Sequence, residues 1–89
     1  SLEMGKPIRQ ARAEVEKSVL ALRTLADFAP LALRTREVAA HYDRTEIQAN
    51  PLGVLFSIQP WNFPYWQALR MAACAWMAGN VVLLKHANI

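Results

Sequence analysis

Apolar residues recur at three- and four-residue steps through the first third of the chain, with mostly polar residues between the early ones. This spacing predicts an amphipathic helix at about residues 7–29. Pro7 fits the first helical position, where a missing N–H group costs nothing. Pro30 leaves two endings open, because the helix either stops near Phe28 or continues beyond the proline with a kink.

The second half contains three apolar segments separated by turn-forming residues. Residues 52–58 (LGVLFSI) predict a buried strand, residues 64–78 a helix that is apolar on nearly every side, and residues 81–85 a second strand. Gly79 stands where a left-handed C-terminal cap of the helix belongs. Together these segments predict an α/β fold, namely an amphipathic helix followed by one βαβ unit with parallel strands. The polar residues 34–50 predict irregular or edge-strand structure.

Charge is concentrated in the first half of the chain. Residues 1–46 hold eight of the ten Lys and Arg residues and all seven Asp and Glu residues, whereas residues 47–89 hold only Arg70 and Lys85. A segment so poor in charge must be buried by structure that the small first half cannot supply, so we expect the chain to be part of a larger core. The basic residues alternate with acidic ones instead of forming a stripe, which argues against a nucleic-acid partner.

The remaining composition excludes several other classes. Residues 47–69 and 71–84 lack charge, but prolines, amides and a Gly-Asn pair interrupt them, so no membrane span is expected. Cys74, the only cysteine, cannot form an internal disulfide, which fits a cytoplasmic location, and we expect its thiol to be buried and inert. No secretory signal, glycine-rich phosphate loop or Ser-His-Asp set is present, and His86 has no metal-binding partner at a useful spacing.

Two segments follow the carboxyl ends of the predicted strands, where open parallel sheets bind ligands. They are residues 60–64 (PWNFP) and residues 85–88, and we expect them to face one ligand. The two prolines stiffen the first segment around Asn62, whose amide is a fixed neutral donor of the kind that a developing oxyanion needs. Two simpler interpretations remain open at this point. In the first, Asn62 serves only as the N-cap of the next helix, and in the second, Lys85 is only a solvated strand end.

Four motifs occur in order along the chain: EMGKP at residues 3–7, PLGV at 51–54, PWNFP at 60–64 and AGNVVLLK at 78–85. They resemble segments found in this order and spacing in the aldehyde dehydrogenase superfamily. The resemblance covers essentially the whole chain, and PWNFP followed by GNVVLLK after one helix is its most specific part. It implies a partial Rossmann-like NAD(P)-binding domain over residues 1–89. The tripeptide KHA at residues 85–87 resembles the succinate-semialdehyde dehydrogenase branch.

The resemblance implies NAD(P)-dependent oxidation of an aldehyde to a carboxylic acid through a cysteine thiolate and a thioester. Asn62 matches the family's asparagine that helps to hold the oxyanion. Lys85 matches the lysine that reaches the adenosine ribose. A homo-oligomeric parent enzyme is expected. The residues that match the strand end along the cofactor are Ile58, Gln59, Pro60 and Trp61.

Asn88 falls where members that prefer NAD often carry a glutamate bonded to the ribose hydroxyls. A carboxylate there would repel a 2′-phosphate and a neutral amide would not, so the parent is expected to accept NADP and to favour it slightly over NAD.

The nucleophilic cysteine and the general-base glutamate of the family lie beyond Ile89, and Cys74 does not match the nucleophile. The resemblance therefore implies an amino-terminal piece of such an enzyme, inactive by itself. A helical module for self-association or partner binding is the alternative.

Overall fold

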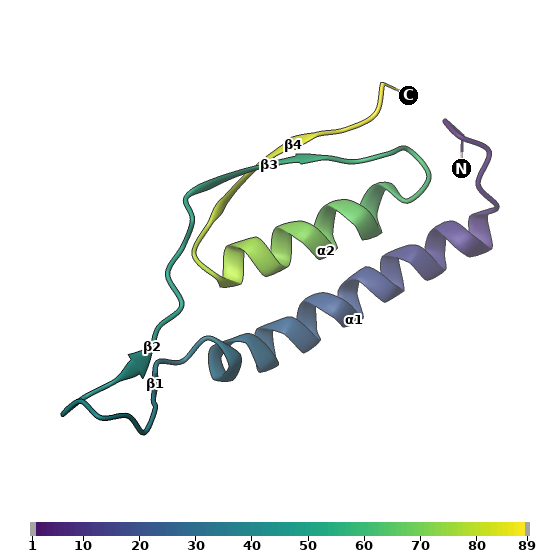
Figure 1. Ribbon diagram of the computed structural model, residues 1–89. Coiled ribbons are helices and arrows are strands. Elements are labelled where there is room, and N and C mark those ends of the chain that lie inside the picture. The colour runs from purple at the N-terminus through teal and green to yellow at the C-terminus, as the bar shows by residue number, and fades with distance from the viewer. Residues whose placement is uncertain (1, 89) are drawn as a thin grey trace.

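The computed structural model describes residues 2–88 and stacks them in three layers. Figure 1 shows the pair of long strands above the second helix, and this helix above the first one. Both ends of the chain lie at the same end of the molecule. The elements are α1 (Ile8–Ala32), β1 (Arg36–Glu37), β2 (Glu46–Ile47), β3 (Val54–Ile58), α2 (Pro64–Met77) and β4 (Val81–Lys85).

Helix α1 continues through Pro30 and ends at Ala32, so the second of the two predicted endings is the observed one. The backbone N–H of Leu33 closes the last turn by donating to the Ala29 carbonyl at 2.9 Å. The buried side of the helix differs from the apolar stripe in the sequence. Its buried side chains belong to Glu14, Ser18 and Ala29, whereas apolar residues such as Ile8 are exposed. The helix therefore packs on α2 through a face of small and polar residues.

Strands β3 and β4 pair in parallel and α2 connects them, which confirms the predicted βαβ unit. The register runs from Val54 opposite Val81 to Ile58 opposite Lys85. Strand β3 begins two residues later than the sequence suggested. The reason is that Gly53 has a φ of 110° and its N–H group bonds to a side chain instead of a neighbouring strand.

That side chain is Asn80, which ties the end of α2 to the start of β3. Its Oδ1 accepts from the N–H groups of Leu52 at 2.6 Å and Gly53 at 2.9 Å, and its Nδ2 donates to the Ala75 carbonyl at 3.3 Å. The helix ends in the predicted left-handed cap, because Gly79 has a φ of 83° and its N–H bonds back to the Trp76 carbonyl. Asn80 is thereby fixed at the turn between helix and strand.

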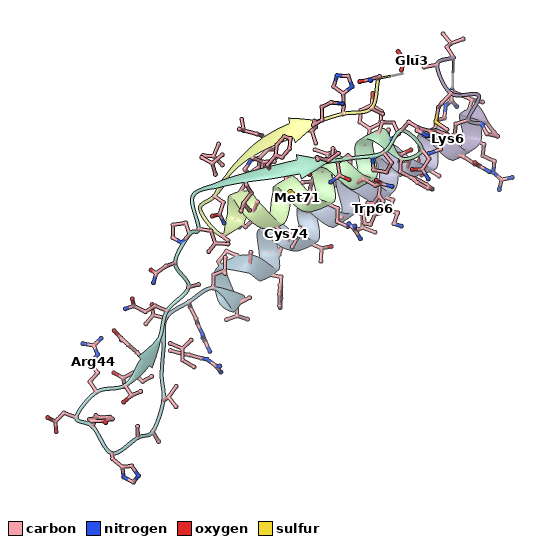
Figure 2. All side chains as sticks on the ribbon, turned by 45° about the horizontal axis from the view of Figure 1, so that its top comes forward. Glu3, Lys6, Arg44, Trp66, Met71 and Cys74 are labelled. Atoms are coloured by element: carbon pink, nitrogen blue, oxygen red, sulfur yellow. The ribbon has the colours of Figure 1, made fainter. Side chains whose placement is uncertain are left out.

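Residues 34–50 form a narrow extension at the far end of the molecule from the two termini (Figure 1). Within it, β1 and β2 pair in antiparallel fashion over two residues each, which agrees with the predicted edge-strand character. Arg44 lies near the tip (Figure 2) and its guanidinium donates to the Glu46 carboxylate at 3.0 Å. These side chains contribute little to the packing of the three layers.

The outer face of the β3–β4 pair is uncovered. Its apolar side chains are 58 to 69% exposed, as expected of a sheet whose burial depends on the larger core that the sequence predicts. The prediction for Cys74 was wrong, because its side chain is exposed. Helix α2 instead buries its alanines at positions 72, 73 and 75. No helix within residues 2–88 has the length and apolarity to cross a membrane.

A buried carboxylate joins α1 to the start of α2. Glu14 is only 6% exposed, and its Oε1 accepts from the backbone N–H groups of Tyr65 at 2.8 Å and Trp66 at 3.0 Å. Its Oε2 accepts from the ammonium group of Lys6 at 2.5 Å. Burial raises the pKa of Glu14, but the bonds from Lys6 and the two N–H groups outweigh it, so the net pKa lies below the ordinary value.

This lowered pKa predicts a loss of stability in acid that depends on Glu14. The unfolded chain would bind the proton at a pH of about 4.3 and the folded chain only at lower pH. The carboxylate therefore stabilises the fold fully above about pH 5, and this contribution is lost as the pH falls through the folded-state pKa. We expect Glu14→Gln to flatten the decline of the unfolding free energy between about pH 5 and 3.

The measurement is chemical denaturation of the 89-residue chain, followed by circular dichroism at each pH. Glu16→Gln, which changes an exposed carboxylate on the same helix, is the control and should keep the decline of the original chain. An equal slope for Glu14→Gln and the original chain would contradict the assignment.

Candidate functional site

The carboxyl ends of β3 and β4 lie side by side, as the sequence predicted. Ile58 pairs with Lys85, and the backbone N–H of Gln59 extends the pairing by donating to the Lys85 carbonyl at 3.0 Å. Residues 60–64 and 86–88 therefore leave from the same edge of the sheet. Figure 1 places this edge near the beginning of α1.

A cavity of about 440 Å³ lies at this edge, between the strand ends and the segment that precedes α1. The two candidate segments both contribute to its wall. Asn62, Ile58, Lys85 and Asn88 are not among its lining residues. Lys6 and Glu14 line it from the opposite side. The residues that line it from the candidate segments and from the strand end before them are Gln59, Pro60, Trp61, Pro64, His86 and Ala87.

Ile58 and Lys85 lie on the face of the sheet that points away from α2. Side chains alternate along a strand, and Ser57 is buried toward the helix whereas Ile58 is 69% exposed. Lys85 is opposite Ile58 in the parallel register and therefore shares its face. The candidate residues thus belong to two surfaces that meet at the strand ends, the cavity on one side and the open sheet face on the other.

Lys85 and Asn88 are brought together. The Lys85 ammonium donates to the Asn88 Oδ1 at 3.3 Å and also to the carbonyl oxygen of His86. Both side chains are exposed, so a ligand at this edge could reach them. The result is a small cluster of one cation and one neutral amide.

Asn62 does not cap α2, so that simpler interpretation of the sequence was wrong. Phe63 occupies the N-cap position and makes no capping bond with its side chain, and Glu14 accepts from the free N–H groups of the first turn instead. Asn62 is half-buried, and its Oδ1 accepts from Gln67 Nε2 at 3.3 Å. This bond orients the amide and leaves the Nδ2 hydrogens available as donors.

Sequence reasoning missed the parts that Lys6 and Glu14 play at this site. The sequence pattern singles out neither residue, because Glu14 alternates with basic residues as on a solvated helix face and Lys6 precedes the predicted helix. A signal was present in the spacing, because Ala11, Glu14 and Ser18 form a stripe of small and polar residues beside the apolar one. Figure 2 shows Lys6 near the beginnings of both helices.

The rest of the described chain shows no competing centre of chemistry. Within residues 2–88, no group of three or more His, Cys, Asp or Glu side chains is placed to hold a metal ion. Cys74 lies ten residues into α2, which puts it roughly 15 Å along the helix from the Asn62 loop. This separation excludes the Cys74 thiol as a nucleophile for a group bound to the Asn62 amide.

Comparison with known proteins agrees with the resemblance in the motifs. The Aldehyde dehydrogenase family matches over residues 1–89. A probable succinate-semialdehyde dehydrogenase [NADP(+)] from Synechocystis is 51% identical over 88 residues, which is 99% of this chain and 19% of the relative. The succinate semialdehyde dehydrogenase [NAD(P)+] Sad of Escherichia coli is 46% identical over 96% of this chain and 18% of its own length.

Solved structures give the same result for the fold. The succinic semialdehyde dehydrogenase of Streptococcus pyogenes, in complex with NADP+, superposes with a TM-score of 0.89 at 32% identity over 96% of this chain and 19% of its own. A structure of Gox0499, from work on cofactor and substrate selection, superposes with a TM-score of 0.90 at 39% identity and similar coverage. The chain spans about a fifth of the length of these relatives. By sequence and by fold, it belongs to the aldehyde dehydrogenase family.

Proposed function

We propose that this chain supplies the oxyanion donor and part of the cofactor site of an NAD(P)-dependent succinate-semialdehyde dehydrogenase. The observation that carries the proposal is the shared edge of β3 and β4, where the Asn62 loop and Lys85 leave neighbouring strand ends. The names of the relatives support the substrate and the cofactor. By itself the chain is proposed to be inactive, because the nucleophile and the base would come from other parts of such an enzyme. Homo-oligomeric assembly and a cytoplasmic location stay predictions.

The residues at the strand ends fit a dinucleotide. Lys85 and Asn88 offer an ammonium group and a neutral amide, donors that suit ribose hydroxyls and tolerate a 2′-phosphate. Ile58 gives an exposed apolar surface beside them, and Gln59, Pro60 and Trp61 continue the strand end toward the cavity. When bound, the nicotinamide would supply the hydride acceptor. The residues of this chain would hold and orient it.

Asn62 would contribute an amide N–H donor whose orientation is fixed before the reaction begins. Oxidation of an aldehyde by a thiolate creates negative charge on the carbonyl oxygen, and a donor that is already oriented needs no reorganisation as this charge develops. The bond from Gln67 fixes the Asn62 oxygen, so the Nδ2 hydrogens are the ones presented. The prolines at positions 60 and 64 restrict the loop that carries them.

We expect Asn62→Ala to lower kcat by about 100-fold to 1,000-fold, the usual effect of removing one oxyanion donor. The assay uses a chimera in which this chain replaces the matching segment of the Synechocystis relative, so that the missing parts of the enzyme are present. NADP reduction with succinate semialdehyde is followed under steady-state conditions. Asn50→Ala, an exposed amide elsewhere in the chain, is the control. A kcat within threefold of the parent chimera would overturn the role of Asn62.

Cofactor choice is proposed to depend on Asn88. We expect Asn88→Glu to place a carboxylate beside Lys85, where it can pair with ribose hydroxyls and repel a 2′-phosphate. The ratio of kcat/KM for NADP to that for NAD should fall by roughly tenfold or more in the chimera, a change of about 1.4 kcal/mol. Asn88→Gln keeps the neutral amide and should preserve the ratio. An unchanged ratio in Asn88→Glu would place the 2′-phosphate elsewhere.

Arg70 is proposed to bind the carboxylate of succinate semialdehyde. Gln67 reaches Asn62, and Arg70 lies three residues further on α2, so both share the side of the helix that faces the donor. The Arg70 side chain is exposed, with its guanidinium 5.8 Å from the ring centre of Trp66. Lys6 is already paired with Glu14, and Lys17 lies over the Trp66 ring at 4.0 Å, so Arg70 is the cation proposed to receive the substrate carboxylate.

We expect Arg70→Gln to raise the KM for succinate semialdehyde by about 10-fold to 100-fold, the effect of losing one charge-assisted hydrogen bond. Butanal, which has the same chain length without the carboxylate, should be oxidised by the variant and the parent chimera with equal kcat/KM. Arg23→Gln, which changes an exposed arginine on α1, serves as the control. Equal losses for both aldehydes would show that Arg70 supports the structure instead of recognising the carboxylate.

A further inference from the structure

The first turn of α2 depends on a carboxylate that comes from another helix. The free N–H groups of a helix N-terminus are usually capped by a residue just before it, but Phe63 makes no such bond. Glu14 lies 51 residues before Tyr65 and accepts from the N–H groups of Tyr65 and Trp66. The position of this helix end is therefore set by α1.

Lys6 connects the same carboxylate to the loop that carries Asn62. Its side chain is only 8% exposed, and its ammonium group donates to Glu14 Oε2. The same ammonium group lies 3.9 Å from the centre of the Phe63 ring, a distance typical of a cation–π contact. Phe63 is the residue directly after Asn62. One buried cation thus contacts both the capping carboxylate and the loop.

These contacts surround Asn62 on its C-terminal side. Phe63 is held by Lys6, Tyr65 and Trp66 are held by Glu14, and Gln67 bonds to the Asn62 oxygen. The intervening Pro64 restricts the backbone, so a shift of the helix end would be passed to the amide. The orientation of the donor is then linked to the Lys6–Glu14 ion pair through the residues that follow Asn62.

We propose that Glu14 and Lys6 are positioning residues that act as a pair to hold the Asn62 amide in the orientation needed for oxyanion binding. This inference rests on the proposed function of Asn62 and adds to it the residues that set its geometry. Glu14→Gln keeps the size of the side chain, but its amide NH₂ would face the Lys6 ammonium group, donor against donor. Lys6→Met keeps the apolar stem and removes the charge.

The test is a double-mutant cycle in the chimera defined above. Glu14→Gln and Lys6→Met should each lower kcat by about 10-fold to 100-fold, as expected for a misplaced catalytic group, with an unchanged KM for NADP. In the Asn62→Ala background the same substitutions should lower kcat by less than twofold, because the donor whose position they set is already gone. A role limited to stability would give the same loss in both backgrounds.

The outcomes separate the two proposals. If Asn62→Ala leaves kcat unchanged, the proposed function fails. If Asn62→Ala lowers kcat, but Glu14→Gln and Lys6→Met either have no effect or act equally in both backgrounds, the positioning inference fails alone. Thermal melts of each variant identify any that unfolds, and Lys6→Met carries the test if Glu14→Gln does not fold. Glu16→Gln, an exposed carboxylate on α1, should leave kcat and the melting temperature unchanged.

Discussion

The structure depends on one buried carboxylate that joins three segments of the chain. Glu14 lies on α1, its ammonium partner Lys6 precedes that helix, and its two N–H partners begin α2. Burying a charge is costly unless it is paired and hydrogen-bonded, and here both carboxylate oxygens have partners. The helix N-terminus adds its own partial positive charge. The same pairing makes the cluster sensitive. Loss of Glu14 would leave Lys6 and the two N–H groups without this acceptor, and loss of Lys6 would leave Glu14 Oε2 without its donor.

A second set of hydrogen bonds holds α2 at its other end, where the Asn80 side chain bonds to the backbone of Leu52, Gly53 and Ala75. Between the hydrogen bonds of Glu14 at its start and those of Asn80 at its end, α2 contributes mainly alanines to the buried interface. Alanines allow close approach, but each buries little area and does not fix where a helix sits along its axis. Directional hydrogen bonds at the two ends supply that constraint. They therefore set the position of the start of α2, and with it the Asn62 loop, relative to the carboxyl ends of β3 and β4.

Local signals in the sequence were sufficient for the βαβ unit. Proline and glycine mark its boundaries, as Pro64 and Gly79 show, and the short apolar runs fit its strands. The parallel topology alone predicted that the carboxyl ends of β3 and β4, at Ile58 and Lys85, lie next to each other. The cap of α2 could not be predicted in this way. A buried carboxylate such as Glu14 has the same local pattern as a solvated one, and its N–H partners lie more than 50 residues away. The exposure of Cys74 likewise depends on which sides of α2 the neighbouring elements cover.

The open face of the sheet is apolar at the start of the strands and carries a charged side chain at their carboxyl ends. At the start, Val54 lies opposite Val81, whereas at the carboxyl end Ile58 lies opposite Lys85. Both valines are more than half exposed, as is Ile58, so an apolar cover is needed along the face. A cover that reached the carboxyl end would bury the Lys85 ammonium group, at a high cost without a partner. Packing therefore favours a cover over the start of the strands and leaves their carboxyl ends exposed.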